Sequence, residues 1–299
     1  MCLFSYISLL AGYTGLYNNL LGLFRLQRME ELLYHYTGQN GFLGIIGNKN
    51  IWASNIHYLN DVKEFIHAID ETKAMIWHRK KDQGNEKLVA LYEKIESRLS
   101  GISKINIFIV SLTEEGDLLS QWRGYCSNGP GYSIGFSKSE IYNLSNLQGF
   151  AFKPCIYDWQ RQRQVIDAPL KRAEELVLSV ISNAPNIIDN AVNRFISEFV
   201  HIAPLLKHRA FSEEKEWRLV SGPVPCTDSR WKTRAGRSTI IPYIEFNLVT
   251  NDGSTPIRNV VVGPGLDKEL ASGAISSFLT KNGIKKWSVT FSQVPYRTT

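Results

Sequence analysis

The spacing of apolar side chains changes along this chain, and each change predicts a different kind of element. Residues 33–37 form a short, mostly apolar segment that carries one histidine and precedes a glycine, which favours a buried strand leading into a turn. Beyond Asp61, a candidate helix N-cap, apolar residues recur at near-helical spacing over residues 65–76. Residues 85–99 repeat that spacing, so we expect two successive helices in this part of the chain.

After these helices the pattern changes to continuous apolar runs and to alternation with a period of two. These runs predict strands over residues 105–112, 131–136 and 151–157. Helical spacing returns over residues 170–199, with a break near Asn183. The remaining predicted elements are strands over residues 51–53, 216–220, 238–246, 260–262 and 287–291 and helices over residues 41–46 and 266–281. This order predicts an α+β fold with a mixed β-sheet core and helical insertions.

Composition favours one large globular domain. Of the 299 residues 43% are hydrophobic, which is enough for a sizeable core, and no repeat interrupts residues 29–299, so we expect a single domain there. Residues 1–28 are apolar, but polar residues interrupt them, and they lack a basic start and a small-residue cleavage site. We expect no membrane span. Two interpretations of this segment stay open: a docking extension, or a start assigned too early, with Met29 as the natural one.

Charge and cysteine content limit the class of partner. The chain has 34 basic and 28 acidic side chains and a formal net charge of +6, which permits an anionic partner such as a dinucleotide or a nucleic acid without requiring one. Its four cysteines, Cys2, Cys126, Cys155 and Cys226, are too scattered for a disulfide framework or a zinc site. We therefore expect a protein of the reducing cytoplasm with no metal site.

A histidine near the front and a pair of glutamates far behind it are the first candidate chemistry. His35 lies where the first strand gives way to a turn, and on its own it is typical of a satisfied core histidine. On a strand, Glu214 and Glu216 would project to one face and Arg218 would continue it, because side chains two apart share a face. Two adjacent carboxylates raise one pKa, while the arginine would hold the other ionised. Such a face suits a positive charge that develops on a sugar ring, although a solvated charged turn has the same pattern.

An aromatic segment before the strand at residue 131 is the second candidate. It places Trp122, Tyr125 and Tyr132 among several glycines. Glycines permit close approach of a backbone, and aromatic rings offer flat faces to a nicotinamide or adenine ring. The structural alternative for Trp122 is an ordinary core anchor. No G-x-G-x-x-G follows the first strand and no P-loop lysine is present, so the sequence supports neither a dinucleotide-binding fold nor a phosphate-transfer loop.

Five separated motifs in this order resemble the bacterial family described as domain of unknown function 2971. The resemblance covers nearly everything from Met29 to the C-terminus. The motifs are Leu33-Tyr34-His35-Tyr36-Thr37, Leu59-Asn60-Asp61-Val62-Lys63-Glu64-Phe65, Gln121-Trp122-Arg123-Gly124-Tyr125 with residues 131–136, Glu214-Lys215-Glu216-Trp217-Arg218, and Val261-Val262-Gly263-Pro264.

A second, weaker resemblance implies a function. A His-x-Thr first strand, a short helix, a second strand, an aromatic middle motif and a late glutamate strand are similar to the ADP-ribosyltransferase superfamily, which implies an ADP-ribosyltransferase-like fold. The resemblance implies that His35 and Thr37 hold NAD as the substrate and that Trp122 or Tyr125 lines the nicotinamide site. The middle motif departs from the superfamily's Ser-Thr-Ser strand, and the insertion over residues 62–101 has no assigned role there.

The same resemblance implies the roles of the late carboxylates. Glu216 would be the catalytic residue that favours the oxocarbenium-like transition state, Glu214 would orient the nucleophile, and Arg218 would belong to the residues around NAD. On this interpretation the chain is a toxin or an antiviral effector. Its acceptor would be nucleic acid or protein, and an antitoxin or regulatory partner would control it.

Two other classes remain open at this stage. Glu213 and Lys215 form an acid-x-lysine triplet, and Asp158 lies upstream, which is the arrangement of a metal-dependent nuclease. A nucleotide-binding module without turnover would use the aromatic segment for binding and the carboxylates as a polar rim.

Overall fold

The computed structural model describes residues 30–59, 62–102, 105–126, 131–179, 186–236, 238–264 and 268–295. The architecture below belongs to the unit Leu32–Thr299. The apolar segment 1–28, the expected N-cap at Asp61 and the expected break near Asn183 lie outside the described residues.

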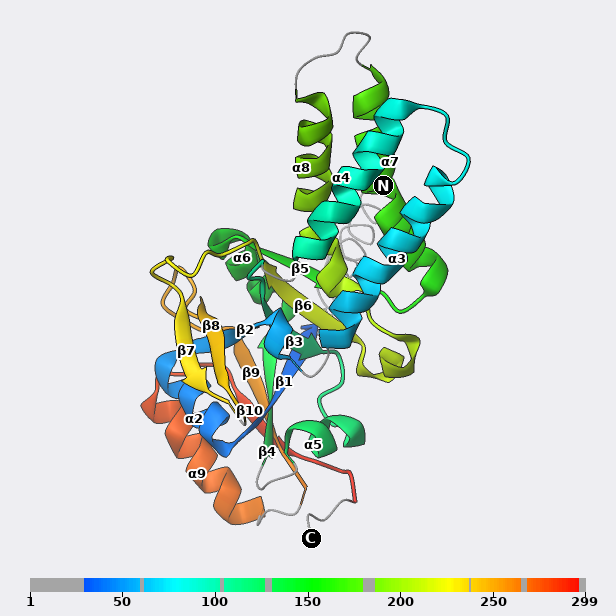
Figure 1. Ribbon diagram of the computed structural model, residues 1–299. Helices are drawn as coiled ribbons and strands as arrows, with labels where there is room; N and C mark the ends of the chain where they lie inside the picture. The colour runs from blue at the N-terminus through cyan, green and yellow to red at the C-terminus, as the bar shows by residue number, and fades with distance from the viewer. Residues whose placement is uncertain are drawn as a thin grey trace, which may run out of the picture. The chain divides into compact units, whose positions relative to one another are not determined.

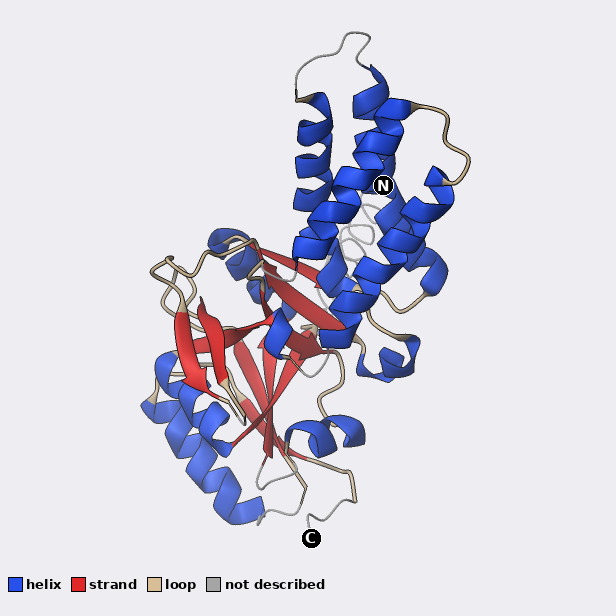
Figure 2. Ribbon diagram, in the orientation of Figure 1, coloured by secondary structure: helices blue, strands red, loops and turns tan. Residues whose placement is uncertain are grey.

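Ten strands of the described residues form one large, mostly antiparallel sheet (Figure 2). The strand order is β10-β9-β4-β1-β3-β2-β8-β7, and β6 pairs with both β3 and β5 beside this path. The strands are β1 (Leu32–Gly38), β2 (Asn50–Asn55), β3 (Phe108–Thr113), β4 (Gly131–Ser137), β5 (Phe150–Pro154), β6 (Glu216–Ser221), β7 (Lys232–Ala235), β8 (Ile240–Asn247), β9 (Ile257–Val262) and β10 (Ser288–Phe291). The expected α+β class with a mixed sheet core is therefore confirmed.

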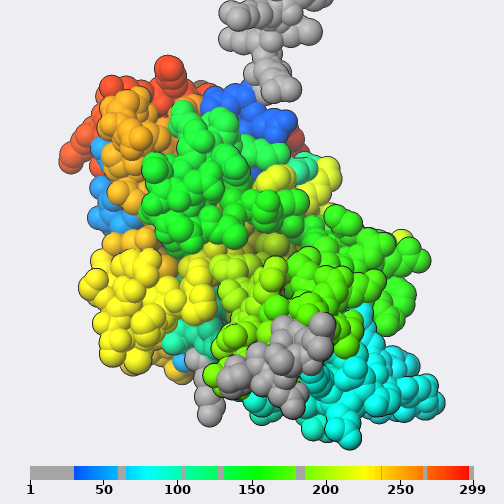
Figure 3. Space-filling model, turned by 90° about the horizontal axis from the view of Figure 1, so that it is seen from above, coloured from blue at the N-terminus to red at the C-terminus, as the bar shows by residue number. Residues whose placement is uncertain are grey.

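Helices cover the sheet in two groups, each with its own hydrophobic core (Figure 1). One core joins the sheet to α2, α6 and α9, and the other joins α3, α4, α7 and α8 to the side of the sheet that carries Ile109 and Val220. Seen from above, the cyan residues of α3 and α4 lie next to the green residues of α7 and α8 (Figure 3). The helices are α2 (Gln39–Asn48), α3 (Val62–Lys80), α4 (Glu86–Gly101), α5 (Leu119–Tyr125), α6 (Lys138–Gln148), α7 (Trp159–Ser179), α8 (Ile187–Ile202) and α9 (Lys268–Lys281).

The start of α4 shows how local sequence fixes an element. The side chain of Asn85 accepts hydrogen bonds from the backbone N–H groups of Lys87 and Leu88, which satisfies donors that have no partner inside the helix. Leu91 and Ile95 then bury one face against the helical core. No helix in the described part of the chain is long and apolar enough to cross a membrane.

The strand β3 is the centre of the sheet around the site. One edge pairs with β6 along residues 109–113. On the other edge β1 pairs only at Thr113, and β2 pairs only at Phe108 and Ile109. The strands β1 and β2 therefore diverge from β3, and the opening between them, which we call the fork, is where α2 joins the two strands.

Some predicted boundaries differ from the structure. The helix α7 begins at Trp159 instead of residue 170, and Pro169 lies inside it. Asp158 explains the earlier start, because its carboxylate accepts a hydrogen bond from the backbone of Arg161 and caps the helix. The strand β5 ends at Pro154 instead of residue 157, since proline offers no N–H to continue a ladder. The elements α5, α6 and β7 were not predicted.

Two glycines make room for one aromatic ring beside the fork. A Cβ atom added at Gly116 would lie 2.7 Å from Cε1 of Tyr34, and one added at Gly135 would lie 2.8 Å from the same atom and 3.2 Å from Cβ of Asn259. The ring of Tyr34 thus lies against the bare backbone of both glycines. Because interiors are closely packed, even one methyl group has no space here.

We expect Gly135→Ala to lower the free energy of unfolding by about 1–3 kcal/mol, the usual cost of overpacking. Gly273→Ala in α9 is the matched control, because its Cβ would meet no atom within 4 Å. That control should raise stability by about 0.5–1 kcal/mol, the usual advantage of alanine over glycine in a helix. Urea denaturation measures both, and equal stability of Gly135→Ala and the wild type would contradict the packing argument.

Candidate functional site

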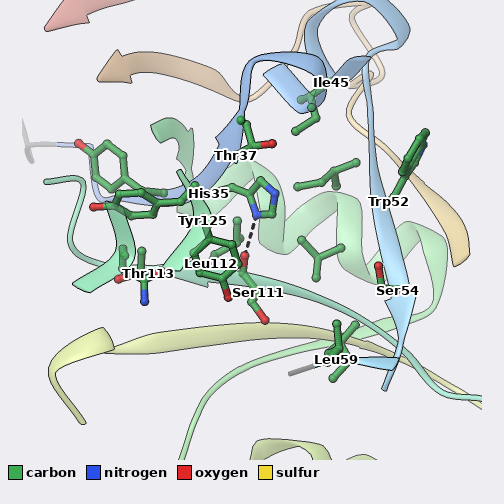
Figure 4. A pocket seen from close by; sticks show the side chains of 18 of the residues that line it. His35, Thr37, Ile45, Trp52, Ser54, Leu59, Ser111, Leu112, Thr113 and Tyr125 are labelled. Atoms are coloured by element: carbon green, nitrogen blue, oxygen red, sulfur yellow. Dashed lines mark hydrogen bonds between the residues drawn. The ribbon is translucent and has the colours of Figure 1, made fainter. Parts of the chain in front are cut away.

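The fork encloses a cavity of about 490 Å³. Small-molecule sites typically measure roughly 300–1,000 Å³. The walls come from β1, α2, β2, β3 and α5, from Glu214 and the start of β6, and from Arg234 of β7. In Figure 4 the imidazole of His35 projects into this space from β1, with Tyr125 on one side and Trp52 and Ser54 of β2 on the other.

The histidine of the first strand is fixed by a backbone carbonyl. Nδ1 of His35 lies 3.0 Å from the carbonyl oxygen of Ser111 in β3. Because a carbonyl oxygen only accepts, Nδ1 must carry the hydrogen, and in the neutral ring Nε2 is an acceptor. Burial lowers the pKa of His35, against a smaller opposing effect of the bond to Ser111. At neutral pH the site therefore holds an uncharged imidazole.

The two aromatic candidates of the middle segment separate. Tyr125 lines the cavity at the end of α5 and is half-exposed, at 51%. Trp122 is not among the residues that line the cavity. It is only 1% exposed, packs edge-on against Tyr36 with ring centroids 4.7 Å apart, and donates from Nε1 to Asp117 at 2.7 Å. The structure thus places Trp122 in the core and Tyr125 at the cavity.

Thr37 also lines the cavity, two residues beyond His35 on β1. Side chains two positions apart on a strand project to the same face, so His35 and Thr37 share one face of β1. Gln121, in the first turn of α5, adds an amide to the wall. His35, Thr37 and Tyr125 are therefore brought together, as the sequence motifs predict.

The glutamate pair has a different local geometry from the expected one. Glu214 is the last residue of a 3-10 helix that spans Arg209–Glu214, Lys215 has a positive φ of 42°, and β6 begins only at Glu216. The prediction that both carboxylates lie on one strand is therefore wrong. Both still line the cavity, and both accept a hydrogen bond of 2.7 Å from Nζ of Lys207.

Glu216 belongs to a buried ionic cluster, which we define as Lys207, Glu214, Glu216 and Arg218. Glu216 accepts from Nε of Arg218 at 2.7 Å and from Nη2 at 3.0 Å, besides its bond to Lys207. Burial alone would raise the pKa of Glu216, but Arg218 and Lys207 outweigh it and lower the pKa to about 2. Burial would lower the pKa of Lys207, but its carboxylate partners raise it above its ordinary value. Glu216 and Lys207 thus both stay ionised at physiological pH.

Arg218 lies behind the site instead of in it. It is only 2% exposed, is not among the cavity-lining residues, and also donates to the carbonyl of Pro204 at 2.6 Å. Its role in the structure is to hold Glu216 ionised, as the sequence argument expects of an arginine on that face. It does not contact the cavity where NAD was expected.

Lys207 is the functional residue that sequence reasoning missed. Its side chain is 2% exposed, and the sequence shows it only as one of many basic residues in the middle of the chain. The sequence feature that could have identified Lys207 is its position in the basic run Lys207-His208-Arg209, shortly before the glutamates. The amide of Gln162 donates to the carbonyl of Lys207 at 2.9 Å, and the backbone N–H of Glu216 donates to the hydroxyl of Tyr157 at 2.8 Å.

The structure gives the residues of the nuclease interpretation other partners or surroundings. Asp158 caps α7, Glu213 is exposed, and Lys215 pairs with Glu115 at 2.5 Å. Among the residues that the structure describes, no three His, Cys, Asp or Glu side chains form a group that would hold a metal ion.

Comparison with known families supports one of the two resemblances over part of the chain. A family described as a protein of unknown function (DUF2971) matches residues 121–219, which run from α5 into β6 and include Tyr125, Lys207 and both glutamates of the cluster. The chain therefore resembles that family over this region. Comparison with curated proteins and with solved structures gave no match.

We expect Glu216→Gln to destabilise the fold strongly. The change leaves Lys207 and Arg218 buried with one carboxylate fewer, and breaking a buried ion pair costs about 3–5 kcal/mol. Urea denaturation measures the loss. Glu213→Gln, at an exposed glutamate, is the control and should stay within about 0.5 kcal/mol of the wild type. Equal stability of the two variants would contradict the role of the cluster.

We expect stability to fall as the pH drops below the ordinary histidine pKa of about 6.5. Below that pH His35 binds a proton in the unfolded state, but the buried imidazole of the folded state does not. The stability that the neutral imidazole contributes is present above that pH and is lost as the pH falls through the lowered pKa. Urea midpoints between pH 8 and pH 5 measure the slope, which His35→Gln should reduce. Part of the slope should remain, since burial also lowers the pKa of His201. A slope that His35→Gln leaves unchanged would show that another group causes the acid sensitivity.

Proposed function

We propose that the chain is an ADP-ribosyltransferase-like enzyme that binds NAD in the fork cavity and transfers its ADP-ribose group. One observation carries the proposal: a single cavity gathers His35, Thr37, Tyr125 and Glu216 from three distant segments. These are the positions that the resemblance assigns to NAD binding and to catalysis. The fork itself, where two strands leave a third, gives an extended ligand access to residues on both sides of the gap.

The reaction needs no metal and no redox cofactor. The bond between ribose C1′ and the nicotinamide nitrogen breaks, and its electron pair neutralises the cationic ring, which leaves as nicotinamide. The nucleophile of the acceptor bonds to C1′ and gives up its proton. Positive charge gathers on the ribose ring between these events, and a carboxylate beside the ring lowers that barrier electrostatically.

Glu216 is suited to this role by its ionisation and limited by its neighbours. A carboxylate has about four acceptor positions, and Lys207 and Arg218 take three of them. One position remains for a ribose hydroxyl, and the pKa of about 2 keeps the group charged. The two cations reduce the field of Glu216, so Glu214, whose side chain is 19% exposed, supplies the second carboxylate near the developing charge.

The other lining residues supply binding. The neutral ring of His35 presents an acceptor to a ribose hydroxyl or to the carboxamide, and the hydroxyl of Thr37 adds a second polar contact. The exposed ring of Tyr125 offers a face to the nicotinamide. The acceptor under this proposal is a nucleic acid or a protein, in the setting of a toxin or an antiviral effector with a cognate regulator.

A nucleotide-binding module without turnover is the second candidate. The observation that favours it is the pairing of both carboxylates with Lys207, which balances charge that catalysis would use. Binding and turnover are separable by experiment.

We expect the purified chain to release nicotinamide from NAD when RNA, DNA or cell extract supplies the acceptor. Tyr125→Ala should lower the rate about tenfold or raise the KM by a similar factor, since an aromatic contact contributes about 0.5–1.5 kcal/mol beyond the area that it buries. Tyr142→Ala is the matched control, because Tyr142 is 53% exposed, lies on α6 and does not line the cavity. Glu214→Gln should lower the rate, and its melting temperature separates that loss from the destabilisation expected when Lys207 loses one carboxylate partner.

Three results would decide between the candidates. Nicotinamide release that falls in Tyr125→Ala and Glu214→Gln but not in Tyr142→Ala would support the transferase. A melting temperature that NAD raises, without release under any condition, would favour the binding module. Neither release nor a shift would reject both.

A further inference from the structure

We infer that Arg234 forms a subsite for the diphosphate of the dinucleotide, at the end of the fork cavity opposite to the ionic cluster. This inference rests on the proposed function for the identity of the ligand, but it concerns residues to which neither motif nor resemblance gives a role. Arg234 lies on the edge strand β7 and lines the cavity together with Trp52 and Ser54 of β2.

Among the described cations Arg230, Lys232 and Arg234 of this segment, Arg234 is the one without a carboxylate partner. Arg230 pairs with Asp228 at 2.8 Å, and Lys232 pairs with Glu245 at 2.8 Å. Within the described residues no carboxylate lies at ion-pair distance from Arg234, and its Nε is buried without a hydrogen-bond partner. An arginine with an unused buried donor in a cavity wall is well suited to accept an anion, because the guanidinium fork matches phosphate oxygens.

Two residues of β2 hold this guanidinium in place. Nη2 of Arg234 donates to the hydroxyl of Ser54 at 3.3 Å. Its Cζ lies 5.8 Å from the ring centroid of Trp52, which is within cation–π range. Trp52 packs in turn against Tyr243 of β8, with centroids 4.6 Å apart. The side chain is therefore positioned before any ligand arrives, which limits the entropy lost on binding.

The charge of the cavity points to an anion. The ionic cluster contributes two carboxylates and two cations, and His35 is neutral, so these groups sum to zero. Lys207 and Arg218 lie behind the lining and balance its two carboxylates, so Arg234 adds a positive charge that no group of the cluster balances. A ligand that is negatively charged and extended fits this lining better than a neutral or cationic one.

The register of β3 fixes the direction of the ligand. Ser54 pairs opposite Ile109, and Glu216 pairs opposite Thr113. At about 3.3 Å per residue, these ends lie roughly 13 Å apart along the strand. One ligand that reaches both must be extended, as a dinucleotide is. Its diphosphate would lie at Arg234 and its nicotinamide ribose at Glu216.

The test compares Arg234→Gln with Arg230→Gln, which makes the same change at an exposed arginine of the preceding turn. Isothermal titration measures binding of NAD, ADP-ribose, nicotinamide riboside and inorganic diphosphate, with the melting temperature as a check on folding. Arg234→Gln should weaken NAD and ADP-ribose about tenfold or more, as expected for a lost bond to a charged group, and should leave nicotinamide riboside unchanged. Arg234→Lys, which keeps the charge, should retain more of the affinity.

The outcomes separate this inference from the proposed function. ADP-ribose binding that depends on Arg234, without nicotinamide release, would uphold the subsite and reject the transferase activity. Nicotinamide release with an unchanged KM for NAD in Arg234→Gln would overturn the subsite and leave the activity standing. Equal affinity of Arg234→Gln and Arg230→Gln for ADP-ribose would also overturn the subsite. A wild-type protein that binds inorganic diphosphate but not ADP-ribose would overturn it as well.

Discussion

A β-strand has two hydrogen-bonding edges, and the way neighbouring strands share the two edges of β3 determines the site. One edge is occupied by β6 over residues 109–113, while β1 and β2 each take only one end of the other edge. On this second edge no strand pairs with Ser111, which lies between the two ends, and His35 reaches the carbonyl of Ser111 instead. A buried carbonyl without a partner costs free energy, so this bond both satisfies the gap and fixes the imidazole. The cavity follows from that division of one edge.

The ionic cluster fixes the opposite wall. Two cations and two carboxylates are taken out of water together, and the mutual pairing of Lys207, Glu216 and Arg218 offsets part of their desolvation. Such a cluster adds little net stability compared with apolar residues, but removing one member leaves a buried charge unpaired. Its presence beside a cavity therefore favours a role in the site over a role in the core alone.

The sequence predicted the elements whose side chains are buried on a regular period. The strands β1, β3, β4 and β6 carry the continuous apolar runs of the core, and α4 carries its buried face at helical spacing. The strand β7 could not be found this way, because its four residues are mostly exposed at the sheet edge and have no apolar alternation. The helix α5 was not predicted, because tertiary contacts of Trp122 with the core, and not an amphipathic pattern, hold it.

Sequence patterns likewise revealed only those residues of the site that local motifs carry. His35, Thr37, Tyr125 and Glu216 were found because local motifs carry them, and the structure brings them to one cavity. Lys207 and Arg234 were not assigned there, because a basic residue in sequence has no mark of burial or of a missing partner. What distinguishes them is their surroundings: Lys207 is enclosed by two carboxylates, and Arg234 has none. The first of these cations therefore stabilises the wall of the cavity, while the second keeps its charge available to whatever the cavity binds.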